Sequence, residues 1–148
     1  MATGDGWTSR LITGLAELLD AADVGTWRPT GGYTAEEIAI VVRGIPQQPD
    51  RLITLAPYRV PSPIGIADFV QGVQLRTRGT TDPRVAEDIA DACLDLLDSA
   101  SNLTVGGIAV VQISHRSYTS MGQDNNGRWE TSSNYYVEAM RPTIHRHD

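Results

Sequence analysis

The chain has 148 residues, with 18 acidic and 12 basic side chains and a formal net charge of −6. An acidic chain lacks the clustered cations that neutralise phosphates, which argues against broad binding to nucleic acid or to anionic membranes. The sequence contains no run of about 18 apolar residues, so it predicts no membrane-spanning helix. The first residues do not have the pattern of a signal peptide. Cys93 is the single cysteine, which excludes an internal disulfide framework.

The length predicts one domain over residues 1–148. Its first predicted element is a helix that Thr8 or Ser9 caps and that runs to about Ala22, with Gly25 as the stop. Short strands are predicted over residues 38–43 and 52–58. Because proline cannot donate a ladder hydrogen bond, Pro57 predicts an edge or a bulge at the end of the second strand.

Residues 68–115 predict a strand, a helix and a second strand, and they form the centre of the predicted domain. The first strand alternates between an apolar set and a polar set, and the polar set includes Arg76 and Arg78. Asp82 and Pro83 predict the N-cap and first position of a helix over residues 83–99. Its predicted apolar stripe consists of Val85, Ile89, Ala92, Cys93, Leu96 and Leu97, and we expect Ile89 and Leu96 to be fully covered. After Gly106-Gly107, residues 108–113 predict a buried strand.

Residues 114–119 can continue that strand, and residues 129–140 predict its partner. Asn126-Gly127 between them favours a turn with positive φ. The pattern predicts a long β-hairpin whose polar tip, residues 122–128, projects from the sheet and adds little to a core.

The sequence gives only weak support for a metal-binding, phosphate-binding or catalytic site. His115, His145, His147 and the one cysteine lack the ligand spacing of a zinc site. The tip partly matches a calcium loop, but a third ligand and the acidic twelfth residue are missing, so turn formation is the favoured interpretation. No phosphate-binding glycine loop and no G-x-S-x-G elbow is present. We therefore expect no catalytic residues, no metal and no cofactor.

Short sequence segments, spread in a defined order along nearly the whole chain, resemble those of a known protein family. They are LAELL (15–19), VGTWRP (24–29), GIP (44–46), PDR (49–51), TLAPY (54–58), GVQLRTRG (72–79), DPR (82–84), GQDNNGRWE (122–130) and NYY (134–136). In order and spacing they resemble the tail-terminator and minor capsid proteins of long-tailed bacteriophages.

The resemblance implies an α+β (mixed α/β) fold: a curved mixed β-sheet with two main helices packed on one face and a long projecting β-hairpin. It implies a structural virion protein, not an enzyme, that forms a ring, usually a hexamer, which caps the tail tube and joins it to the head. The implied location is the head–tail joint of a virion assembled in the host cytoplasm. The implied partners are further copies of the chain, the tail tube protein and the head–tail connector protein, while genomic DNA passes through without sequence-specific binding and no membrane is involved. A head-completion or connector protein, or a small cytoplasmic binding module or enzyme, stays open as an alternative.

Candidate interface residues come from two places. Arg76 and Arg78 can pair with acids across a subunit boundary, although a solvent-exposed strand face explains them equally well. The hairpin supplies the others: Gln123, Asp124, Asn125, Asn126, Arg128, Trp129 and Tyr135. Because a closed ring needs two different patches of one subunit to meet, the hairpin and the acidic face of helix 83–99 are the predicted patches.

Overall fold

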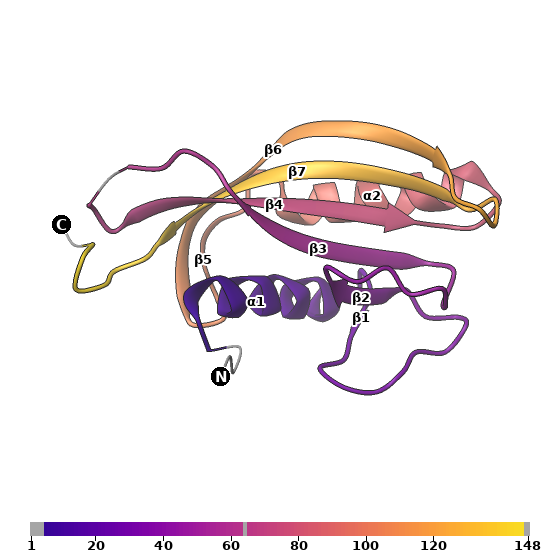
Figure 1. The fold of residues 1–148 in the computed structure, drawn as a ribbon, viewed down its shortest axis with the longest axis horizontal. Coiled ribbons are helices and arrows are strands. Elements are labelled where there is room, and N and C mark those ends of the chain that lie inside the picture. The colour runs from indigo at the N-terminus through magenta and orange to yellow at the C-terminus, as the bar shows by residue number, and fades with distance from the viewer. Residues whose placement is uncertain (1–4, 64, 147–148) are drawn as a thin grey trace.

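The computed structural model describes residues 5–63 and 65–146, so His147 lies outside the described residues. In this part of the chain, two helices pack against one curved sheet of seven strands (Figure 1). The elements are α1 (Trp7–Ala21), β1 (Thr26–Trp27), β2 (Ala39–Val42), β3 (Leu52–Arg59), β4 (Asp68–Arg78), α2 (Pro83–Leu97), β5 (Ser101–Val105), β6 (Ile108–Gln123) and β7 (Trp129–Met140). The predicted α+β fold is confirmed.

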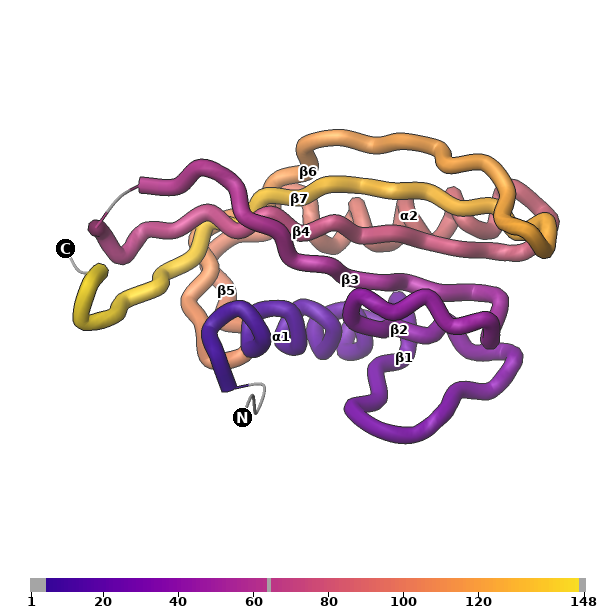
Figure 2. Tube along the Cα trace, in the orientation of Figure 1, coloured from indigo at the N-terminus to yellow at the C-terminus, as the bar shows by residue number. Residues whose placement is uncertain are grey.

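The sheet is mixed and has the strand order β1-β2-β3-β4-β7-β6-β5. β1, β2 and β3 run parallel, and the other pairs are antiparallel. β6 and β7 pair from Val110 and Ala139 to Gln123 and Trp129, and Figure 2 shows them side by side up to their shared turn. The predicted long hairpin is therefore confirmed.

One apolar core joins both helices to the same face of the sheet. Successive strand residues point to opposite faces, so the alternating apolar residues of each strand collect on the face that the helices cover. The core includes Leu11, Leu15 and Leu19 of α1, Ile53 and Leu55 of β3, Val73 and Leu75 of β4, Ile89, Cys93 and Leu97 of α2, and Tyr135 and Val137 of β7.

The start of α1 differs from the prediction. The N-cap is Gly6, which makes no side-chain cap hydrogen bond, and Thr8 and Ser9 lie inside the first turn. The helix begins earlier because Trp7 is anchored: its Nε1–H donates to the carbonyl of Met140 at 2.9 Å, and its ring meets Phe69 edge-on at 5.3 Å.

The end of α1 also differs, because Asp23 takes the place expected for Gly25. Asp23 has a φ of 61°, its amide donates to the carbonyl of Asp20, and the amide of Val24 donates to that of Leu19. This is the usual glycine-type helix ending, made here with aspartate. Gly25 instead allows close packing, since a β-carbon there would lie 2.9 Å from Cγ1 of Ile40.

The start of α2 is as predicted, whereas its buried stripe is rotated. Oδ1 of Asp82 accepts from the amide of Arg84 at 3.0 Å, and proline occupies the first turn. Ile89 is 5% exposed, as expected, but Leu96 is only half-buried. The buried residues are Ala86, Ile89, Ala90, Cys93 and Leu97, because the small alanines let the helix approach the sheet on their side. Burial raises the pKa of Cys93 to about 12, so it is an inert core thiol.

β5 was not predicted. Its short polar sequence carries little strand signal, and the turn that ends it, Gly106-Gly107, has φ values of 55° and 75°. Val105 pairs with Ile108 across this turn, which makes β5 and β6 a tight hairpin. The edge predicted at Pro57 is confirmed, since β2 pairs with β3 only as far as Leu55.

Candidate assembly interface

The hairpin tip is a compact turn organised by Asp124. Its Oδ1 accepts hydrogen bonds from the amides of Asn126 and Arg128, both at 2.9 Å. The amide of Gly127 donates to the carbonyl of Asp124 at 3.0 Å, and Gly127 has the predicted positive φ, 76°. The tip sequence therefore sets its own shape.

Arg128 ties this turn to the loop between β2 and β3. Its side chain is almost fully buried. The guanidinium donates to Oδ2 of Asp124 at 2.9 Å and to the carbonyl of Gln47 at 2.6 Å, and it lies 3.2 Å from Oδ1 of Asp50. Asn126 adds a bond to Oε1 of Gln47 at 3.1 Å. The expectation that the tip adds little to the packed interior is thus wrong for Arg128.

Arg78 holds the same loop from β4. It is 2% exposed, so it does not lie on a solvent-facing strand surface. Its Nε donates to the carbonyl of Asp50 at 2.9 Å, and its Nη2 donates to those of Pro46 and Pro49 at 2.7 and 2.8 Å. Arg78 and Arg128, together with residues 46–50, form what we call the arginine clamp.

The negative charge of Asp124 offsets part of the positive charge of the two clamp arginines. Burial lowers the pKa of Arg78, and the positive charge of Arg128 lowers it further. Burial alone would raise the pKa of Asp124, but hydrogen bonds from the amides of Arg128 and Asn126 and from the Arg128 guanidinium outweigh it, so this pKa is lowered. Asp124 is therefore ionised at neutral pH and compensates the buried guanidinium charge.

The other candidate residues divide into interior and surface positions. Arg76 is half-buried and pairs with Glu130 at 3.4 Å. Tyr135 lies in the core, 2% exposed, with its ring 5.1 Å from that of His115. Trp129 is half-buried, and its amide donates to the carbonyl of Thr80 at 3.1 Å. The surface of the tip is formed by Gln123, Asn125 and Asn126, which are exposed.

Sequence reasoning missed a second polar cluster, formed by Arg59, Arg141 and Arg146 around Phe69. Arg59 and Phe69 are far from Arg141 and Arg146 in the chain, and the pairing of β3, β4 and β7 brings the two parts together, so spacing along the sequence carried no signal. Within residues 5–63 and 65–146, no group of three or more His, Cys, Asp and Glu side chains is placed to hold a metal ion. No helix in the described part of the chain is long and apolar enough to cross a membrane.

Comparison with solved structures gives a fold match. A chain of a structure described as the virion of a native gene transfer agent particle aligns with a TM-score of 0.61 at 14% identity, covering 90% of this chain and 96% of that one. No curated protein matches the sequence. A family model described as bacteriophage tail terminator protein matches residues 18–141, from the second half of α1 to the end of β7. This family is a structural phage family and not an enzyme family, and the chain belongs to it.

Proposed function

We propose that the protein is the tail terminator of a long-tailed phage particle. In this role it forms a ring, most simply a hexamer, which caps the finished tail tube and joins it to the head. The observation that carries the proposal is the family match over residues 18–141, which includes α2, every strand of the sheet from β1 to β7 and the whole hairpin. The proposed partners are other copies of the chain, the tail tube protein and the head–tail connector.

The geometry of the subunit supports assembly through the hairpin end. A ring requires a rigid patch that a different patch of the next copy can recognise. The arginine clamp gives the tip such rigidity, and it leaves Gln123 and Asn125 exposed for contacts. A net charge of −6 also suits a protein that surrounds DNA without holding it, since like charges disfavour contact with phosphates.

The decisive experiment combines native mass measurement of the purified protein with a density map of the intact particle. We expect six copies in a ring at the joint between head and tail tube. A protein that is monomeric both alone and in the particle would overturn the ring. A ring on the head side of the joint would instead identify a connector protein.

A point substitution tests the tip. Asn125→Arg adds a long charged side chain at an exposed position that has no described hydrogen bond. We expect unchanged thermal unfolding, loss of rings and overlong, uncapped tails. Thr30→Arg, in an exposed loop between β1 and β2, is the matched control and should assemble normally. Normal tails with Asn125→Arg would exclude the tip from the interface.

A further inference from the structure

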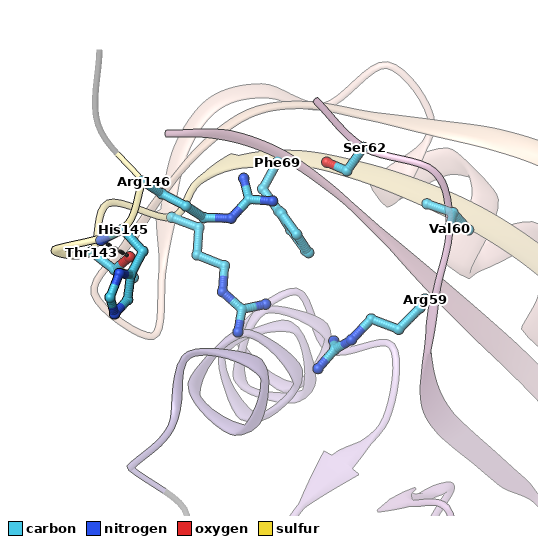
Figure 3. A pocket seen from close by; sticks show the side chains of 8 residues that line it. Arg59, Val60, Ser62, Phe69, Thr143, His145 and Arg146 are labelled. Atoms are coloured by element: carbon cyan, nitrogen blue, oxygen red, sulfur yellow. Dashed lines mark hydrogen bonds between the residues drawn. The ribbon is translucent and has the colours of Figure 1, made fainter. Parts of the chain in front are cut away.

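Three arginines meet at the end of the subunit opposite the hairpin tip. They surround Phe69 in an open cavity of about 500 Å³, for which β3 supplies Arg59 and the segment after β7 supplies Arg141 and Arg146. Figure 3 shows Arg59 and Arg146 approaching this space from two sides of Phe69. We call this cluster the arginine pocket.

Aromatic rings and backbone carbonyls hold the guanidinium groups in place. Arg141 lies over the rings of Trp7 and Phe69, at 4.8 and 4.7 Å from their centroids, and Arg146 lies 4.8 Å from that of Phe69. Arg146 also donates to the carbonyl of Ile66 at 2.7 Å. Arg146 is held further by a hydrogen bond from Nη2 to the carbonyl of Pro63 at 3.2 Å. Stacking fixes the planar cation of Arg141 as well, and because this guanidinium donates no hydrogen bond to the described residues, its edge is free for a ligand.

The pocket holds positive charge that no carboxylate of residues 5–63 and 65–146 neutralises. No carboxylate is among the described residues that line it. None of the ion pairs in the described part of the chain includes Arg59, Arg141 or Arg146. Burial lowers the pKa of Arg141, and the charges of Arg59 and Arg146 lower it further, so the three cations repel one another. An anionic ligand would relieve this repulsion.

The same chain carries the complementary charge on α2. Asp91 and Asp95 are exposed, they lie one helical turn apart on the same face, and no described residue forms an ion pair with either. Because no α2 residue lines the arginine pocket, these two surfaces do not meet within one subunit. A contact between different patches of two copies is heterologous, which is the kind of contact that closes a ring.

We infer that the arginine pocket binds the carboxylates of α2 from the neighbouring copy. This inference rests on the proposed ring. Guanidinium groups match carboxylates with paired hydrogen bonds, and the contact buries both uncompensated charges together. DNA phosphate offers similar chemistry, but the net charge of −6 on the whole chain opposes approach to DNA.

A charge-swap experiment tests the contact. The pocket variant is Arg59→Glu with Arg146→Glu, the helix variant is Asp91→Arg with Asp95→Arg, and the combined variant carries all four changes. Subunit association is measured by sedimentation at about 0.15 M salt, where the Debye length is about 8 Å and only charges in close contact still attract strongly. We expect each paired variant to weaken association roughly 10-fold or more, and the combined variant to recover most of it. Arg116→Glu, an exposed position on β6, is the control and should associate like the wild type.

The outcomes separate this inference from the proposed function. A wild type that forms no ring overturns both. If the pocket variant still forms rings, or if the combined variant does not regain association, the arginine pocket does not bind α2 of the neighbouring copy, and the proposed ring still stands. Normal rings with altered DNA retention would assign the arginine pocket to phosphate instead. Arg59→Gln, which changes one exposed side chain, provides the same comparison if the paired variant fails to fold, and it should weaken association in the same direction.

Discussion

Gly14 of α1 lies against Gly106 in the β5–β6 turn, so closely that a β-carbon on Gly14 would be 2.4 Å from the backbone nitrogen of Gly106. The turn is packed just as tightly against the helix, since a β-carbon on Gly106 would be 2.0 Å from the carbonyl oxygen of Arg10 in α1. Neither helix nor turn offers a flexible side chain that can move aside. Two glycines thus set the distance between α1 and the edge of the sheet.

Gly14→Ala should therefore destabilise the subunit, even though alanine favours helices. Overpacking against backbone atoms costs about 1–3 kcal/mol. Replacing glycine with alanine in a helix gains about 1 kcal/mol in helix propensity. Because the clash here is with rigid backbone, we expect a cost near the top of its range and therefore a net loss of stability. Denaturant unfolding measures the net loss. Gly32→Ala is the control, because nothing lies within 4 Å of its β-carbon, and its effect should stay within about 0.5 kcal/mol. A Gly14→Ala variant more stable than wild type would contradict the packing.

Ile89 and Leu96 distinguish the buried side of α2 from its flank. Ile89 is buried among core residues, so Ile89→Ala should lower the free energy of unfolding by about 2–5 kcal/mol through lost burial and a residual cavity. Leu96 is only half-buried, so Leu96→Ala should cost clearly less. Equal losses in parallel denaturant titrations would show that the helix is rotated from the position described.

The arginine clamp predicts that Arg78 matters for folding. Arg78→Met removes three hydrogen bonds and leaves the carbonyls of Pro46, Pro49 and Asp50 without that donor. We expect a loss of about 2–3 kcal/mol in the free energy of unfolding. Arg116→Met, at an exposed position, should leave this free energy nearly unchanged. If both variants unfold alike, the clamp contributes nothing to stability.

Glu37 predicts an acid-dependent contribution to stability. The guanidinium of Arg28, at 2.6 Å, and the amide of Thr34 lower the pKa of Glu37 from 4.5 to about 2. A lowered pKa means that the folded state favours the ionised form, so the contribution is present above about pH 4.5 and is lost as the pH falls towards 2. The difference in unfolding midpoint between wild type and Glu37→Gln should shrink over that range. A difference independent of pH would refute the assignment.

The parts of the fold that could be predicted are those whose signals are local. The alternation in β4, the Asp82-Pro83 start of α2 and the Asn126-Gly127 turn each depend on neighbours in sequence. The roles of Arg78 and Arg128 could not be predicted, because their partners in the loop at 46–50 lie 28 to 81 residues away. Arg76 and Arg78 lie on the same face of β4, yet the loop at 46–50 covers only Arg78.

The same long-range packing limits how the hairpin can be tested. Shortening residues 123–127 to a two-residue turn would remove Asp124, whose side chain accepts three hydrogen bonds from residues of the tip. Such a deletion would disturb the folding of the subunit as well as any contact beyond it. Substitution at Asn125 avoids this because its side chain lies outside the arginine clamp.

The arginine clamp has a consequence for the kinetics of assembly. The backbone of the tip is already fixed by bonds to Asp124, and its position by bonds to the loop at 46–50, so little conformational entropy is left to lose when two copies meet. Docking should then resemble the collision of two rigid bodies, with a small heat-capacity change that reflects only the area buried. The rate of ring closure would be governed by the frequency and orientation of encounters, and not by a slow ordering step at the tip.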